Sequence, residues 1–207
     1  MAKIGIFGGT FNPIHTGHLM LVEEALRSGG LDRILLVPSG ESYLKDQSQI
    51  ASREDRLAMA QLAAGSILGP VEVSEVETRR EGPSYTADTL RELRAEYPED
   101  ELTLMIGADS LLELSRWREP EVILGLASLM VFTRGGQDGA ELERAAEALR
   151  RERGARIRLM EAFTLTLSSS QIRGLIREGH AFGPLVTAPV RDYIMSKGLY
   201  GWKEKRK

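Results

Sequence analysis

The segment Gly8–His18 concentrates residues that could handle phosphate groups. Two of the chain's three histidines, His15 and His18, stand three residues apart in it, and its two leading glycines let the backbone approach a ligand closely. A helix beginning near Thr16, its predicted N-cap, would aim free N–H groups and the positive end of its dipole at the same space. Imidazole N–H groups donate to phosphate oxygens, more strongly when protonated. The spacing therefore predicts a phosphate-binding loop with His15 and His18 as candidate catalytic residues.

Simpler interpretations of this segment stay open from the residues alone. Gly8-Gly9 could form only a tight turn between a strand and a helix, and the two histidines could be capping or surface residues. A metal site is less favoured because His-x-x-His lacks a third ligand nearby. No Gly-Lys-Ser/Thr follows, which excludes a Walker A loop, and the run Gly5–Thr10 breaks the Gly-x-Gly-x-x-Gly spacing. A dinucleotide-dependent redox enzyme is therefore disfavoured.

A second polar cluster, Ser168–Arg173, comes immediately before an apolar helical pattern. Taken alone, its serines could simply cap the helix, and Arg173 could be a solvated helix residue. Together with a phosphate-binding loop the cluster gains another meaning, because a hydroxyl-rich helix start and a guanidinium fork suit a triphosphate. We therefore expect the two segments to form the two halves of a triphosphate clamp.

Short strand-like runs alternate with helical stretches along the chain, which indicates βαβ units and a mostly parallel sheet covered on both faces. Right-handed crossovers then give an α/β, doubly wound, Rossmann-like fold, in which ligands bind beyond the carboxyl ends of the strands. The predicted strands are Lys3–Phe7, Arg33–Val37, Val71–Val76, Leu102–Ile106, Leu129–Thr133 and Ile157–Met160. The predicted helices between them are His18–Ser28, Arg53–Ile67, Ala87–Tyr97, Ser110–Leu114, Glu121–Leu126 and Ala140–Arg151.

After Met160 the pattern is helical only, with predicted helices over Ser168–Glu178 and Pro189–Lys197. Pro189 near the first position and Gly198 just past the end are typical boundaries of a helix. No repeat and no linker of low complexity divides the chain. We therefore expect a single domain over residues 1–207, with an α/β core (1–160) and a helical C-terminal cap or subdomain (161–207).

Composition excludes several classes of protein. With 42% hydrophobic and 28% charged residues, the 207-residue chain has an ordinary globular balance. It has no cysteine, so disulfides, thiolate metal sites and cysteine nucleophiles are excluded. A net charge of −3 argues against a nucleic-acid partner, and the basic residues from Lys203 onward are interpreted as a solvated end. Because neither a signal peptide nor a membrane span is apparent, the sequence predicts a soluble, cytoplasmic protein without a membrane partner.

The whole run Gly8–His18 resembles the glycine-rich, His-x-x-His phosphate motif of the nucleotidyltransferase superfamily, which joins a nucleoside monophosphate from ATP or CTP to a phosphorylated acceptor. Leu167–Arg173 is similar to the Ile-Ser-Ser-Thr-x-x-Arg motif of the same superfamily, with Leu167 and Ser170 at the first and fourth places. This second motif implies contacts with the β- and γ-phosphates of ATP. Together with the segments described next, the resemblance implies ATP-binding roles for Gly8, Gly9, Thr10, Phe11, Lys45, Gly107, Asp109, Ser168, Ser169 and Arg173.

Arg79–Leu90 closely resembles the stretch of nicotinate mononucleotide adenylyltransferases that contacts the nicotinate ring and its carboxylate. It leads a strand into a helix, with Thr86 as the expected cap, and N–H groups at a helix start are a suitable seat for a carboxylate. Ile106–Ser110 also matches that family, in which Asp109 would accept hydrogen bonds from ribose hydroxyls. Trp117 corresponds to the aromatic residue that stacks on the pyridine ring. The resemblance thus implies that the acceptor binds to Ser84, Tyr85, Thr86, Trp117 and Arg134.

Several of these residues also have a simpler explanation. Tyr85 and Trp117 could be core or rim aromatics, Asp109 could cap a short helix, and Arg134 could be a solvated turn residue. One segment departs from the family, because Ser42–Lys45 stands where the family often has Pro-Pro-His-Lys. Its lysine keeps a cation that could meet phosphates, but the histidine of the motif is absent.

The resemblance implies transfer of AMP from ATP to nicotinate mononucleotide, which gives nicotinate adenine dinucleotide and pyrophosphate in NAD biosynthesis. Mg²⁺ is expected to travel on the ATP phosphates, without a dedicated metal cage in the protein. The alternatives are another acceptor, such as nicotinamide mononucleotide or phosphopantetheine, or a nucleotide-sensing module without catalysis. The expected partners are ATP and nicotinate mononucleotide, and a homo-oligomer is left open.

Overall fold

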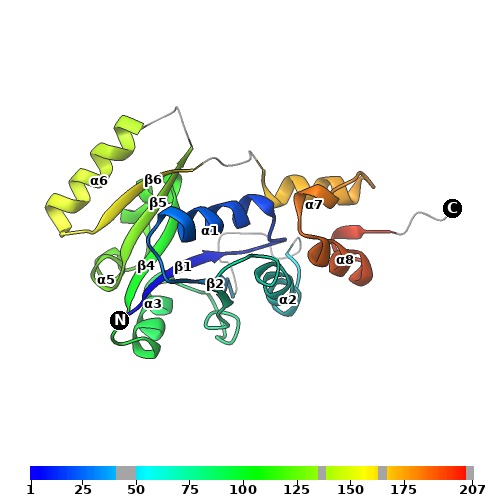
Figure 1. The fold of residues 1–207 in the computed structure, drawn as a ribbon, viewed down its shortest axis with the longest axis horizontal. Helices are drawn as coiled ribbons and strands as arrows, with labels where there is room; N and C mark the ends of the chain where they lie inside the picture. The colour runs from blue at the N-terminus through cyan, green and yellow to red at the C-terminus, as the bar shows by residue number, and fades with distance from the viewer. Residues whose placement is uncertain (41–49, 135–138, 163–166, 204–207) are drawn as a thin grey trace.

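Six parallel strands form one sheet in the computed structural model, which describes residues 1–40, 50–134, 139–162 and 167–203 (Figure 1). The strand order β3-β2-β1-β4-β5-β6 is that of a doubly wound fold whose order reverses between β1 and β4. The predicted α/β, Rossmann-like class is therefore confirmed, while the predicted Lys45 lies outside the described ranges. The strands are β1 (Lys3–Gly9), β2 (Arg33–Pro38), β3 (Val71–Val73), β4 (Glu101–Gly107), β5 (Ser128–Arg134) and β6 (Ile157–Ala162).

Helices cover both faces of the sheet, as the alternating pattern predicted. They are α1 (Thr16–Ser28), α2 (Arg53–Ala64), α3 (Thr86–Glu96), α4 (Ala108–Leu112), α5 (Pro120–Leu126), α6 (Gly139–Arg153), α7 (Ser169–Arg177) and α8 (Ala188–Lys197). β3 and α2 each end three residues before their predicted ends, at Val73 and Ala64. Over the part of the chain that the structure describes, no helix is long and apolar enough to cross a membrane.

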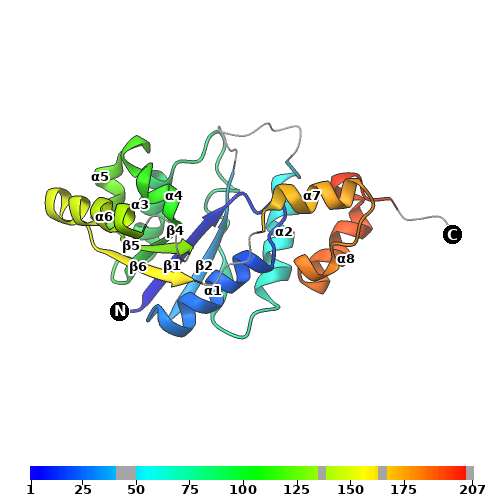
Figure 2. The same ribbon diagram turned by 90° about the horizontal axis from the view of Figure 1, so that it is seen from above.

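Two apolar cores lie on the two faces, because successive strand residues point to opposite sides. Ile4 and Ile6 of β1 belong to the core that contains residues of α3, α4, α5 and α6. Phe7 belongs to the other core, which contains residues of α1, α2, α7 and α8. α7 and α8 lie together at one end of the molecule, beyond the carboxyl end of β1 (Figures 1 and 2). The C-terminal helices therefore stand at the end of the sheet where this fold class binds ligands.

Two predicted helix caps are wrong by one residue. α1 is capped by His15, whose extended backbone precedes the helix, and Thr16 is its first residue. The Thr16 hydroxyl is used elsewhere, because it donates to the Leu185 carbonyl at 3.2 Å. In the same way Tyr85 is the N-cap residue of α3, and Thr86 lies in its first turn.

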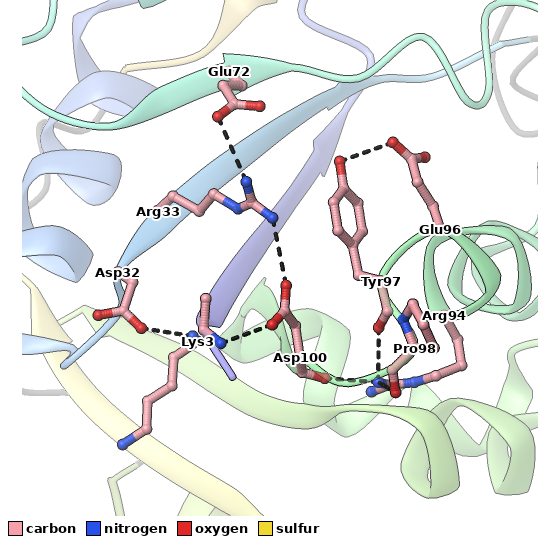
Figure 3. Close-up of polar contacts among 10 residues, drawn as sticks. Lys3, Asp32, Arg33, Glu72, Arg94, Glu96, Tyr97, Pro98 and Asp100 are labelled. Carbon is pink, nitrogen blue, oxygen red and sulfur yellow. Dashed lines mark hydrogen bonds and ion pairs between the residues drawn. The ribbon is translucent and has the colours of Figure 1, made fainter.

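A polar network ties together the amino ends of β1, β2 and β4, at the opposite edge of the sheet (Figure 3). Asp100 accepts a hydrogen bond from the Ala2 N–H at 2.7 Å and lies 3.5 Å from the Arg33 guanidinium. Arg94 donates to the carbonyls of Tyr97 and Asp100 at 3.1 and 2.6 Å. These contacts fix the chain where it enters β4, at the end of the sheet away from α7 and α8.

Candidate active site

The predicted phosphate loop leaves the carboxyl end of β1, next to the reversal of the strand order. Gly8 is exposed there, and a Cβ at this position would meet only the Val37 carbonyl oxygen, at 4.0 Å. Gly9 is closely packed instead, since a Cβ there would come within 2.7 Å of the Phe11 ring. Phe11 is buried and has a left-handed φ of 48°, a conformation that costs a non-glycine residue on the order of 1 kcal/mol or more. Its ring belongs to the core, so Phe11 can meet a nucleotide only through its backbone.

The two histidines of the motif form a stacked pair at the start of α1. Their ring centroids are 3.7 Å apart, and the ring planes are inclined by 24°. The His15 N–H donates to His18 Nδ1 at 3.2 Å, so the neutral His18 ring carries its proton on Nε2. The Phe11 ring packs edge-on against His18, with a centroid distance of 5.2 Å. Both imidazoles therefore point the same way.

Burial decides the charge of His15. The side chain is only 5% exposed, and its Nδ1 has no hydrogen-bond partner among the residues that the structure describes. Desolvation lowers the pKa of His15 from 6.5 to about 4, against the opposing effect of a backbone hydrogen bond. His15 is therefore neutral near pH 7. It can act as a neutral N–H donor.

The first turn of α7 brings the C-terminal polar cluster against the phosphate loop. Ser169 Oγ donates to the Pro13 carbonyl at 2.9 Å, and Arg173 donates to the Asn12 carbonyl at 2.9 Å. Ser168 is the N-cap residue of α7 and uses its hydroxyl for the cap. The two predicted halves of the clamp thus meet, although these bonded pairs are 156 and 161 residues apart in sequence. Because Ser169 and Arg173 bind the loop backbone here, their contacts with ATP stay a prediction.

A cavity of about 210 Å³ opens beside the loop at the carboxyl ends of β1, β2 and β4. Its lining joins residues that the sequence assigns to two different substrates. Gly8, Gly9 and Thr10 come from the ATP set, and Ser84, Thr86 and Trp117 come from the acceptor set. The remaining lining residues are Ser39, Glu77, Leu104, Met105 and Ile106.

Two polar residues of this lining, Ser39 and Glu77, escape sequence-based prediction. The Ser39 N–H donates to the Gly9 carbonyl at 2.8 Å, while its buried hydroxyl has no partner within the described ranges. Glu77 accepts a hydrogen bond from Thr89 Oγ1 at 2.7 Å. Burial raises the pKa of Glu77, and the hydrogen bond from Thr89 opposes that shift. Their only sequence signal is position, since Ser39 directly follows β2 and Glu77 stands seven residues before Ser84.

Tyr85, Gly107 and Asp109 stand within three residues of residues that line this cavity. Tyr85 carries the Arg118 guanidinium 4.5 Å from its ring centroid. Gly107 and Asp109 are exposed at the carboxyl end of β4, and Gly107 is the N-cap of α4, so Asp109 is not the cap residue. Arg134 is the last residue of β5, and its side chain lies outside the description. Their contacts with substrates stay predictions.

Comparison with known sequences identifies the class of protein. A sequence model of the cytidylyltransferase-like family matches residues 6–175, so the chain belongs to that family. A probable nicotinate-nucleotide adenylyltransferase of Lachnoclostridium phytofermentans is 36% identical over 201 residues, which cover 97% of this chain and 100% of the relative. A second protein of that name, from a Synechococcus strain, is 40% identical and is covered over 94% of its length by 96% of this chain. Within the family, the chain therefore groups with the probable nicotinate-nucleotide adenylyltransferases.

Solved structures show the same fold at lower identity. Plasmodium falciparum nicotinic acid mononucleotide adenylyltransferase complexed with NaAD has a TM-score of 0.80 and 17% identity, with 98% of this chain and 99% of that chain covered. A putative nicotinate-nucleotide adenylyltransferase from Vibrio parahaemolyticus has a TM-score of 0.69 and 21% identity, with coverages of 97% and 96%. At these identities the likeness establishes the fold, and the site is argued from this chain's own residues.

Proposed function

We propose that this chain transfers AMP from ATP to nicotinate mononucleotide, releasing pyrophosphate and forming nicotinate adenine dinucleotide. The observation that carries the proposal is the cavity of about 210 Å³, whose lining contains Gly8–Thr10 of the phosphate loop together with Ser84, Thr86 and Trp117. An enzyme that joins two mononucleotide units must hold both of them in one space and in reach of the same charge-stabilising groups. The juxtaposition of these two sets of residues supports the proposal.

The proposed reaction is a direct displacement. An oxygen of the acceptor's phosphate attacks the α-phosphorus of ATP, and a new P–O bond forms. The bond from that phosphorus to the bridging oxygen breaks, and pyrophosphate leaves with the electron pair. Because the attacking phosphate is already negatively charged, the step needs no covalent enzyme intermediate and no general base. Catalysis then consists of positioning and of neutralising charge in transit.

The histidine pair supplies the preorganised donors for that charge. His18 keeps its Nε2 proton because its Nδ1 accepts from the His15 N–H, and the Phe11 ring holds the imidazole in place. A donor that is fixed before the reaction stabilises the oxygens of the departing pyrophosphate without a reorganisation cost. In this scheme His15 and His18 contact the α- and β-phosphate oxygens.

Mg²⁺ enters as part of the substrate, bound to the phosphates of ATP. Within the described ranges, no group of three or more His, Asp or Glu side chains could hold a metal ion. Octahedral Mg²⁺ commonly keeps waters and borrows phosphate oxygens, so an all-protein cage is not required. The ion neutralises phosphate charge, and the protein's own residues provide the geometry.

The acceptor side is built on the start of α3. Thr86 lies in the first turn of this helix and lines the cavity, so the free N–H groups of that turn offer a seat for the nicotinate carboxylate. Trp117 lines the same cavity and offers an aromatic face to the pyridine ring. A carboxylate seat should favour nicotinate over nicotinamide mononucleotide, because the neutral amide gains less from a helix N-terminus.

Incubation with ATP, Mg²⁺ and one acceptor at a time tests the proposal, with pyrophosphate release followed and the dinucleotide identified by mass. We expect a higher kcat/KM for nicotinate than for nicotinamide mononucleotide. Equal values would contradict the carboxylate seat at the start of α3. Turnover with phosphopantetheine alone would replace the acceptor, and an absence of turnover with all three would favour a nucleotide-sensing module.

A further inference from the structure

Arg56, on α2, is the largest of the fully buried side chains, with 2% of its surface exposed. Its guanidinium donates to three backbone carbonyls from three different segments. Nη1 lies 3.0 Å from the Thr10 oxygen, Nη2 lies 3.0 Å from the Gly40 oxygen, and Nε lies 3.2 Å from the Ala51 oxygen. Desolvation lowers the pKa of Arg56, which marks the burial of this cation as costly.

Stability alone is a weak reason to keep such a cation. Well-packed hydrophobic residues can often replace buried ion pairs at no loss of stability, so the geometry of the Arg56 contacts is the more informative property. The fork of N–H donors on a rigid plane is suited to holding several acceptors at fixed mutual positions. In this chain the three carbonyls lie in the phosphate loop, just after β2 and just before α2, so Arg56 connects these three segments.

One of the three carbonyls belongs to a residue that lines the candidate active site, and a second belongs to a residue packed directly behind that lining. Thr10 lines the cavity, and its carbonyl is held toward α2 by Arg56. Because the peptide unit is planar and trans, the N–H of the same peptide points the opposite way. Gly40 packs against the acceptor side, since a Cβ there would lie 2.5 Å from the Glu77 carbonyl oxygen and 2.6 Å from Ser84 Oγ.

We propose that Arg56 is a positioning residue for nucleotidyl transfer, which fixes the phosphate loop at Thr10 relative to the acceptor wall at Gly40. The inference rests on the proposed function for its catalytic consequence, and its structural part stands independently. Arg56 acts through the backbone of the two walls that it connects. Since misplacement of reacting groups by about 1 Å can cost about 10²-fold in rate, loosening this connection should act on turnover.

Arg94 provides a matched control. It too donates to several backbone carbonyls, those of Tyr97, Asp100 and Leu126 at 3.1, 2.6 and 3.2 Å among them, but at the amino end of β4 (Figure 3). Arg56→Lys and Arg94→Lys each keep a positive charge and lose the fork, so both should lower the thermal midpoint. Only Arg56→Lys should lower kcat, by at least about 10-fold and with KM for ATP and the acceptor changed less than about threefold.

The three histidines of the chain give a second readout that does not depend on activity. In NMR spectra of the imidazoles, Arg56→Lys should shift the signals of His15 and His18, which follow Thr10 in the loop, and leave exposed His180 in place. Arg94→Lys should leave all three unchanged. All proteins are measured with a stabilising osmolyte such as trimethylamine oxide, which strengthens folding of a weakened variant.

The outcomes separate the two proposals. If the wild-type chain forms no dinucleotide, the proposed function fails, and the imidazole spectra alone decide whether Arg56 positions the loop. If wild-type turnover is normal and Arg56→Lys has a kcat within twofold of Arg94→Lys, with unmoved His15 and His18 signals, the positioning role is refuted. A fall in kcat of the same size in both variants also refutes it, because general destabilisation then explains both.

Discussion

Replacing His15 with asparagine should remove a specific part of the acid sensitivity of this protein. Asparagine is a favourable N-cap residue, so α1 can still begin where it does, and its side chain does not titrate. We expect the wild type to lose more unfolding free energy than His15→Asn as the pH falls from 7.5 to 4. Urea denaturation of both proteins across this range measures the difference, with His180→Asn, an exposed histidine, as the control.

The magnitude follows from the two proton affinities of His15. In the unfolded chain its pKa has the ordinary value of 6.5, whereas in the folded chain burial lowers the pKa to about 4. Between these values the unfolded state binds more protons, so the stability that neutral His15 contributes is complete above pH 6.5 and is lost as the pH falls. The linkage relation gives a loss on the order of 2 kcal/mol at pH 5 and about 3 kcal/mol at pH 4.

Two results would refute this reasoning. Parallel pH profiles for the wild type and His15→Asn, separated by a constant offset, would mean that folding does not shift the proton affinity of His15. A direct NMR titration offers an independent check, and an apparent pKa between 6 and 7 for His15 would contradict its burial as the dominant influence. The control His180→Asn replaces an exposed side chain and should follow the wild type throughout.

Three further substitutions probe the site and its supports. His18→Ala should slow pyrophosphate release by at least about 10²-fold, the scale of one preorganised donor, and near-normal turnover in the folded variant would remove His18 from the mechanism. Tyr200→Phe deletes the hydrogen bond that the Tyr200 hydroxyl donates to Asn12 Oδ1 at 2.9 Å, while this oxygen still accepts from the Ala51 N–H. Urea denaturation should therefore show a loss of unfolding free energy of about 1 kcal/mol, and no loss would show that this hydrogen bond contributes nothing to stability. Glu77→Gln removes a carboxyl group whose pKa is raised by burial. The stability of the wild type relative to this variant should therefore fall as the pH rises above 4.5 and through the raised pKa. A difference in thermal midpoint that stays constant with pH would contradict this direction.

The sequence predicted the site best where the signal is local. Residue type and spacing identify Gly8–His18 and Ser168–Arg173 as candidate phosphate-binding segments. The fold brings the two segments together because parallel strands place their carboxyl ends at one edge of the sheet. The errors at Thr16 and Thr86 have a different origin. Thr16 has the side chain of a cap, but a hydrogen bond to Leu185, 169 residues away, uses its hydroxyl. No local pattern contains that contact.

Arg56 shows what a closer examination of one helix could have found. In isolation it is one of several charged residues in Arg53–Ala64 and suggests a solvated face. Its partners on the helix surface are nevertheless apolar, since Met59, Ala60 and Ala63 follow at spacings of three, four and seven and are buried with it. A charged residue on the apolar stripe of a helix is the available signal. Its carbonyl partners, up to 46 residues away, could not be inferred without the fold.

The segment Gly8–His18 contains no lysine, so the hydrogen bonds to its backbone carbonyls affect how it could bind phosphate. A loop that binds phosphate without its own cation must rely on N–H donors, the α1 dipole and the removal of carbonyl oxygens from the ligand side. In this loop the carbonyls of Thr10, Asn12 and Pro13 already accept hydrogen bonds from Arg56, Arg173 and Ser169. Two of these donors come from α7, so this helix shapes the electrostatic potential of the loop. Under the proposed function, the charge on Arg56 and Arg173 also adds a positive field behind the loop.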